Sequence, residues 1–220
     1  MPSKAKTAFL ENSKDIVELW RIHQDVAGQG PGRKFGVEVL NRSAIVFITA
    51  CWESYIEDLA TESFDHLLAK ATSPAAIPPK VRALATAPIW EQKDPTKVWE
   101  IADTGWRALL IAHKAATLEK WLGTFNTPKT VQVNSLYADL LGIKKLSSSW
   151  SWQGMSAANA GTKLDTFVEV RGDIAHRLNP GKVVHKVLGT NYHDHVKSIV
   201  DCCEGAVRDH LIANTGGNAW

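Results

Sequence analysis

An arginine and a histidine stand five residues apart in the string RGDIAHR, as Arg171 and His176. The guanidinium of an arginine is a planar fork of donors that matches two oxygens of a phosphate. A histidine, with an ordinary pKa of about 6.5, can both take up and release a proton at neutral pH. These two residue types can hold an anion and transfer a proton, which suits acid–base chemistry at an anionic ligand.

Both residues fall on a helix that the apolar spacing predicts over residues 157–178. Because successive helical residues are about 100° apart, Arg171 lies near the middle of the apolar stripe and His176 about 140° away from it. An unpaired buried guanidinium is costly, so Arg171 needs an acidic partner, a protein interface or an anionic ligand. One chain cannot point both side chains at one spot, whereas two copies that meet across a two-fold axis can.

Two neighbours of Arg171 are candidates for supporting roles. Gly172 costs a helix about 1 kcal/mol relative to alanine, and close approach by a backbone or a ligand is the usual reason for such a glycine. Asp173 stands three residues before His176 and can hold its imidazole in one tautomer. It also stands four residues before Arg177, so a surface ion pair is the plain alternative.

The rest of the chain predicts an all-α fold, because apolar spacings of three and four recur and sustained alternation does not. The predicted helices cover residues 13–27, 36–71, 80–86, 96–123, 135–141, 157–178 and 192–213. The second is the longest and is expected to be the central rod of a bundle. No repeat or linker divides the chain, so we expect a single domain over residues 1–220 with its core over about 13–213.

Composition limits the classes of function. The 220 residues are 45% hydrophobic and 22% charged, as in a soluble globular chain. A net charge of +2 produces no overall field that attracts polyanions, so any such site is local. Three cysteines, two of them adjacent, make no disulfide framework, and no run of about 18 apolar residues is present to span a membrane. We therefore expect a cytoplasmic protein.

The string RGDIAHR, together with residues 50–57 (ACWESYIE), carries a resemblance to a known family. The sequence resembles the HEPN domains, in which a late helix carries an arginine, four to six further residues and then a histidine. Trp52 and Glu53 look like an aromatic–glutamate segment of the RiboL-PSP subgroup. The resemblance covers the helical order over residues 40–213. It implies an all-α, HEPN-like helical bundle with a long second helix and the R-x4-H motif on a late helix.

The resemblance also implies a homodimer that joins two arginine–histidine pairs in one cleft. Many members use that cleft as a metal-independent endoribonuclease, so it implies catalytic roles for Arg171 and His176, with no metal and no cofactor. The 2′-hydroxyl of RNA would attack its own phosphate, leaving a 2′,3′-cyclic phosphate and a 5′-hydroxyl. By family analogy the protein is a toxin or phage-defence effector. Its expected partners are RNA, a second copy and an antitoxin or another defence-system protein, and no membrane.

The alternative is a non-catalytic HEPN dimer that serves as a binding or scaffolding module, in which Arg171 only seals the interface. Glu53 likewise has two interpretations: it pairs with Arg171 inside the protomer, which we favour, or it lines the cleft.

Several residues outside the motif are candidates for binding RNA. Lys144 and Lys145 precede Trp150 and Trp152 in a predicted mobile loop, and exposed rings beside lysines can stack on single-stranded RNA. The same rings can fold back onto the core, and the sequence leaves both interpretations open. Lys182 and Lys186, just past the motif helix, would add phosphate contacts, although a solvated basic loop is the plainer account.

The remaining histidines and cysteines receive structural interpretations. His193 and His195 are two residues apart, so they point different ways on a helix and make a poor metal site; we expect them to be solvated. His210 lies on the apolar stripe of the last helix and is expected in the interior or at an interface. Cys202 and Cys203 have no evident base partner and are assigned to packing.

Overall fold

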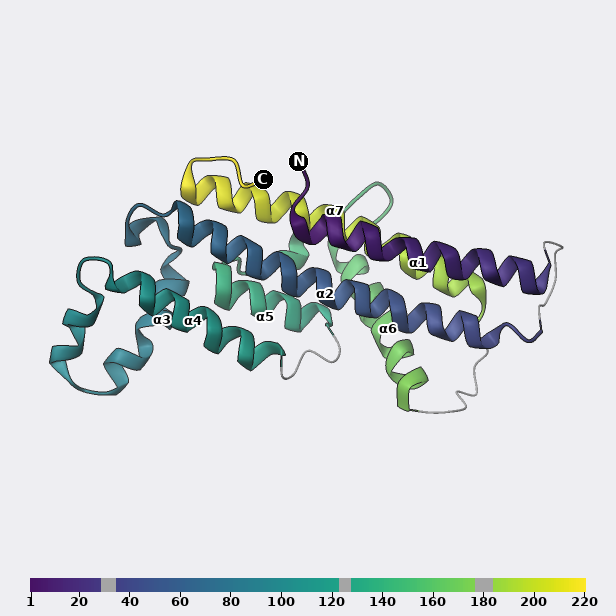
Figure 1. Ribbon diagram of the computed structural model, residues 1–220, viewed down its shortest axis with the longest axis horizontal. Helices are drawn as coiled ribbons and strands as arrows, with labels where there is room; N and C mark the ends of the chain where they lie inside the picture. The colour runs from purple at the N-terminus through teal and green to yellow at the C-terminus, as the bar shows by residue number, and fades with distance from the viewer. Residues whose placement is uncertain (29–34, 123–127, 177–183) are drawn as a thin grey trace.

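The computed structural model describes residues 1–28, 35–122, 128–176 and 184–220, and these fold into seven α-helices and three short 3₁₀ helices (Figure 1). Within these ranges the backbone forms no strand beyond an isolated bridge between Trp152 and Met155. The predicted all-α fold is therefore confirmed. No helix among the described residues is long and apolar enough to cross a membrane.

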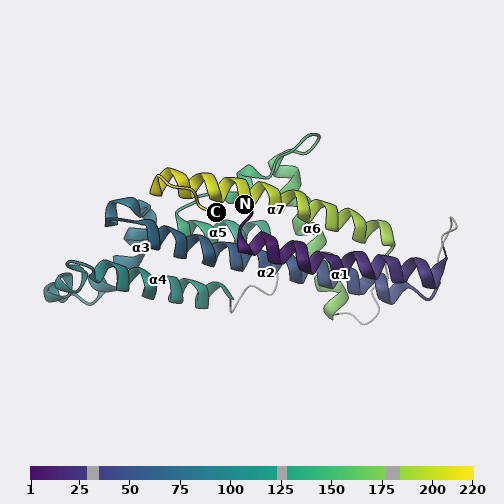
Figure 2. The same ribbon diagram turned by 45° about the horizontal axis from the view of Figure 1, so that its top comes forward.

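Three long helices form the body of the bundle: α1 (Lys4–Ala27), α2 (Glu38–Lys70) and α7 (Lys186–Thr215). They lie side by side in both views, with α1 antiparallel to the other two (Figures 1 and 2). The predicted central rod is α2, which packs against α1, α4, α5, α6 and α7. Its buried side chains include Ile45, Ile48, Trp52, Ile56 and Leu59, all at most 1% exposed. Their spacing follows the helical period, and so this face of α2 forms the centre of the core.

Helix α1 begins well before residue 13, where the sequence predicted its start. The Ser3 hydroxyl accepts a hydrogen bond from the Lys6 amide, which caps the helix. The carboxylate of Glu204 on α7 accepts from both the Ser3 amide (2.6 Å) and the Ser3 hydroxyl (2.7 Å). The early start thus depends on a residue far away in sequence.

The predicted third long helix, over residues 96–123, is wrong as one piece. A 3₁₀ helix, η2 (Pro95–Ile101), is followed by a break and then by α4 (Gly105–Leu122). At the break, Asp103 has a φ of 51°, and a Cβ on Gly105 would lie 1.8 Å from the carbonyl oxygen of Glu100. A regular helix cannot pass through such a turn, so the two pieces point in different directions.

Other helices differ from their predictions in length. Helix α3 (Pro79–Glu91) continues through Pro88, and a 3₁₀ turn, η1 (Pro74–Ala76), precedes it. Helix α5 (Thr130–Leu141) begins before residue 135, because the Thr130 amide donates to the Asp165 carboxylate at 2.7 Å. Helix α7 begins at Lys186 rather than at residue 192.

Helix α6 (Ala157–His176) has two different halves. Its first half is anchored in the core by Ala160, Leu164, Phe167 and Val168. From Glu169 to Ala175 no residue is fully buried, and this half extends away from the body of the bundle (Figure 1). The extending half carries the arginine of the motif.

Candidate functional site

Arg171 lies where α6 meets α2 and α7. Its side chain is half-buried, and its Nε atom is inaccessible to solvent. Its positive charge favours the ionised form of two groups on neighbouring helices, the Glu53 carboxyl on α2 and the Tyr192 hydroxyl on α7. Burial acts in the opposite direction and is the larger effect, so the pKa of Glu53 is raised overall. The guanidinium thus lies close enough to α2 and α7 to act on one ionisable group of each helix.

The segment around Glu53 explains how that carboxylate comes to face α6. Trp52 is fully buried, and its Nε1 atom donates to the carbonyl oxygen of Pro128 at 3.0 Å. Tyr55 is buried as well, and its hydroxyl donates to the carbonyl oxygen of Val200 on α7 at 3.0 Å. These two anchors fix the rotation of α2 about its axis. Glu53, one residue from Trp52, is therefore left half-buried on the flank toward Arg171.

Tyr192 was not predicted as a site residue. Its hydroxyl lies 3.0 Å from the Thr49 hydroxyl, and its ring stacks on Phe167 with centroids 4.4 Å apart. The ring therefore braces α6 against α2 and α7 next to Arg171. Its place on the apolar stripe of the last predicted helix was the only signal in the sequence.

Gly172 has open space on its outer side. A Cβ placed there would have no atom within 4 Å, apart from the neighbouring backbone of its own helix. Within the described part of the protomer, no close approach explains this glycine. Asp173 is exposed beside it.

Parts of the predicted site lie outside the described residues. The backbone of His176 ends α6, but its side chain is outside the described set, as are Arg177 and Lys182. Three expectations therefore stay predictions: that His176 converges with Arg171, that Asp173 supports His176, and that Lys182 contacts a phosphate. Lys186 lies at the start of α7, with its ammonium 5.8 Å from the centre of the Trp20 ring on α1.

The prediction that Trp150 stacks on RNA from a mobile loop is wrong. The loop contains a 3₁₀ helix, η3 (Leu146–Ser149), after which Trp150 is fully buried. Its Nε1 atom donates to the Cys203 sulfur at 3.1 Å, and its ring meets Trp52 edge-on at 6.0 Å. The ring has no face left for a base, so the alternative interpretation, folding back onto the core, is confirmed for Trp150.

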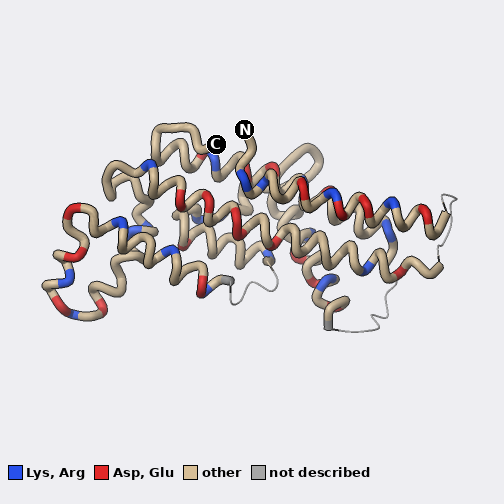
Figure 3. Tube along the Cα trace, viewed as in Figure 1, with Lys and Arg blue, Asp and Glu red and all other residues tan. Residues whose placement is uncertain are grey.

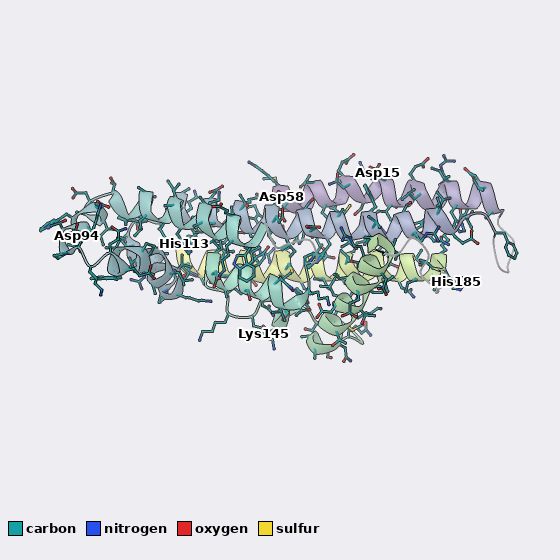
Figure 4. All side chains as sticks on the ribbon, turned by 90° about the horizontal axis from the view of Figure 1, so that it is seen from below. Asp15, Asp58, Asp94, His113, Lys145 and His185 are labelled. Atoms are coloured by element: carbon teal, nitrogen blue, oxygen red, sulfur yellow. The ribbon has the colours of Figure 1, made fainter. Side chains whose placement is uncertain are left out.

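The other candidates of this loop remain at least partly accessible. Trp152 is half-buried, and its ring contacts His195 with centroids 5.4 Å apart. Lys144 and Lys145 are exposed, and Figure 4 shows Lys145 pointing away from the bundle. These two lysines keep their predicted role in binding RNA as an expectation.

The expectation that His193 and His195 are solvated is wrong. Both are buried, and the rings of Trp152 and Phe167 pack against His195. His195 Nε2 lies 2.9 Å from the carbonyl oxygen of Ala160, and burial lowers the pKa of both imidazoles. His210 is half-buried, with its Nε2 2.8 Å from the carbonyl oxygen of Leu141, so the choice between an interior and an interface position stays open.

Cys203 packs fully in the core, as predicted, and burial raises its pKa. Among the described residues, no group of three or more histidine, cysteine, aspartate or glutamate side chains could hold a metal ion.

The described residues form an all-α bundle with a long second helix, and a late helix carries an arginine whose charge acts on Glu53 of the Trp–Glu segment. The model of the RiboL-PSP-HEPN family matches residues 10–209. The chain belongs to this family, and the resemblance seen in the sequence is confirmed. Neither the curated proteins nor the solved structures contain a significant match to the chain.

Proposed function

We propose that this protein is a metal-independent endoribonuclease that cuts RNA at a site shared by two copies of the chain. The observation that carries the proposal is the half-buried guanidinium of Arg171, held at a helix junction on the extending half of α6. Membership of a HEPN family supports the choice of RNA as substrate. A half-buried guanidinium suits an oxygen-rich anion such as a phosphodiester.

The proposed reaction is a transesterification within the RNA. One His176 takes the proton from the 2′-hydroxyl, and the oxygen attacks the neighbouring phosphorus. The bond to the 5′-oxygen breaks, and the His176 of the second copy donates a proton to that leaving oxygen. Arg171 offsets the negative charge that develops on the phosphorane. The products are a 2′,3′-cyclic phosphate and a 5′-hydroxyl.

The extending half of α6 supports dimer formation at this place. Val170 and Ile174 pack against the core of the protomer but stay half-exposed, and Gly172 leaves room for a close neighbour within the described residues. A second α6 seated on this half would cover the apolar side chains and bring a second arginine and histidine to the same cleft. A toxin or phage-defence role, with an antitoxin or another defence-system protein as regulator, forms part of the proposal.

Cleavage of RNA in EDTA tests the proposal. At equal folded concentrations, His176→Ala is expected to lower the cleavage rate at least about 100-fold, the usual effect of losing a general acid or base. His113→Ala is the matched control, because His113 lies toward the end of the bundle away from α6 (Figure 4) and is expected to leave the rate unchanged. Cleavage that persists in His176→Ala contradicts the mechanism. A wild-type dimer that never cleaves RNA supports the scaffolding alternative.

A further inference from the structure

An apolar pocket of about 140 Å³ lies between α3 and α4, at the end of the bundle away from the extending half of α6 (Figure 1). Its wall includes the buried side chains of Ile77, Ala85 and Leu110 and the half-buried side chains of Trp106 and Leu109. An apolar cavity of about 150 Å³ can hold one benzene ring. The pocket therefore has room for a single ring or a short branched chain.

Contacts with the end of α2 hold the α4 wall of the pocket in place. Arg107, next to Trp106, donates hydrogen bonds to the carbonyl oxygens of Leu68 (2.6 Å) and Ala71 (2.5 Å). The guanidinium carbon of Arg107 also lies 4.4 Å from the centre of the Trp106 ring, which orients the ring. On α3, Ala85 is small, and a longer side chain there would fill the space. The pocket is thus formed before any ligand binds.

The pocket is bordered by an arginine that has no ion-pair partner among the described residues. Arg82 lines the pocket from α3 and is exposed. Lys80 on the same helix pairs with Asp139 at 3.0 Å, and Lys97 pairs with Glu100 in the segment between α3 and α4, which carries charges of both signs (Figure 3). An arginine that both lines a cavity and is exposed covers the wall with its methylene groups and leaves its charge near solvent. The guanidinium of Arg82 is therefore available to an anion at the mouth of the pocket.

We propose that this pocket binds a small apolar acid, with one ring or a short branched chain between α3 and α4 and a single carboxylate on Arg82. The planar fork of a guanidinium matches the two oxygens of a carboxylate, and one arginine offsets one negative charge. A free small molecule is favoured over a protein partner, because the pocket holds one side chain only and a stable protein interface buries at least about 1,000 Å². The site does not depend on the proposed ribonuclease, since it lies at the other end of the bundle (Figures 1 and 2).

Binding of benzoate and of benzamide to the full chain tests the proposal at neutral pH, where only benzoate is charged. The two molecules have nearly the same size, and the saturation-transfer NMR signal of each measures its affinity. We expect a dissociation constant for benzoate on the order of 0.1–1 mM, as for a ligand of about ten non-hydrogen atoms. Benzamide is expected to bind about fivefold more weakly, because it forms no charge pair with Arg82.

Arg82→Gln isolates the contribution of the charge. This exposed change is expected to weaken the binding of benzoate about fivefold and to leave that of benzamide unchanged. Arg208→Gln, an exposed change of the same kind on α7, is the matched control and should leave both affinities unchanged. Equal affinities of the wild type for the two ligands overturn the proposal, as does an affinity for benzoate that Arg82→Gln does not alter.

Ala85→Leu tests the location of the site, because the added atoms fill the pocket. If circular dichroism and thermal unfolding show that the variant is folded, we expect it to bind neither ligand, and binding that persists overturns the proposal.

The wild type supplies a second measurement in case Ala85→Leu does not fold. Benzoate is expected to shift the indole proton resonance of Trp106, which Trp106→Phe identifies, because this ring lines the pocket. The resonance of Trp152, whose ring contacts His195 on α7, is the control and should not move. A Trp106 resonance that stays in place at saturating benzoate overturns the proposal.

Discussion

At the scale of single residues, the segment Trp52–Glu53–Ser54–Tyr55 divides its tasks between the two sides of α2. Trp52 and Tyr55 point inward and bond to distant carbonyl groups, whereas Glu53 points to the flank where Arg171 lies. The inward anchors determine the orientation of the outward carboxylate. Substitutions at the anchors are therefore expected to act on stability first and on the site only through the position of α2.

Substitution of Trp150 tests whether its ring stabilises the core, as its burial indicates. Trp150→Ala removes a fully buried ring and its bond to Cys203, so we expect a loss of about 3–5 kcal/mol in the free energy of unfolding. Trp99, at 77% exposure, is the control, and Trp99→Ala is expected to cost at most about 0.5 kcal/mol. Urea denaturation measures both. Equal effects of the two changes would contradict the packing described for Trp150.

Two helical glycines with opposite surroundings test the open side of α6. Gly172→Ala adds a methyl group to empty space and is expected to stabilise the isolated protomer by up to about 1 kcal/mol. Gly189→Ala is the contrast, because its Cβ would lie 2.5 Å from the ring of Trp20, and a loss of about 1–3 kcal/mol is expected. Thermal unfolding of dilute protein measures both changes.

Gly172→Ala also bears on the dimer. If a second chain or RNA approaches this glycine closely, the variant loses cleavage or dimer formation even though its helix is more stable. A variant that gains stability and keeps full activity would show that nothing approaches there.

At the scale of elements, α7 is the helix most sensitive to acid. It carries His193, His195 and His210, and burial is the main cause that lowers the pKa of each. Their folded pKa values lie below the unfolded value of about 6.5. As the pH falls through about 6.5, these histidines bind protons in the unfolded chain before they do so in the folded protein. Their contribution to the free energy of unfolding is therefore complete above that pH and is lost as the pH falls below it.

Acid titration of a variant checks the contribution of α7. The free energy of unfolding is expected to fall less steeply between pH 7 and pH 5.5 in His195→Gln than in the wild type, because the amide can still donate to the carbonyl of Ala160 but does not titrate. Asn191→Gln, an exposed change on α7 that involves no titrating group, is the control and should leave the slope unchanged. Urea midpoints at several pH values measure the slope, and a slope that His195→Gln does not alter would contradict the argument.

At the scale of the whole molecule, the site region lies on one side of an elongated bundle, and the paired helices α3 and α4 lie at the far end from the extending half of α6 (Figures 1 and 2). The proposed cleft needs two copies of α6, because one helix cannot direct Arg171 and His176 to the same point.

A charge placed on α6 tests where the two copies meet. Ala175→Arg puts a bulky cation on the exposed side of the extending half and is expected to shift sedimentation from dimer to monomer and to abolish cleavage. Thr162→Arg is the matched control, exposed on the anchored half of the same helix, and should sediment as the wild type does. Dimers that persist in Ala175→Arg would place the contact elsewhere.

Much of the fold was predictable from the sequence because it depends on local periodicity. The apolar spacing identified α2 as the central helix, and Trp52 and Glu53 with the RGDIAHR string indicated the family. The break before α4 was missed because it depends on a positive φ at Asp103 and on a clash that only glycine at position 105 avoids. The starts of α1 and α5 were missed because Glu204 and Asp165 supply their bonds from other helices.

The sequence by itself determined which side chains are available for chemistry and which helix carries each of them, since both follow from residue type and period. Only the tertiary structure decided that Glu53 and Tyr192 lie near Arg171, that Trp150 is buried, and that Gly172 faces open space. These facts depend on how far each helix is rotated against its neighbours. That rotation is determined by contacts between residues far apart in the chain, which a local pattern does not contain.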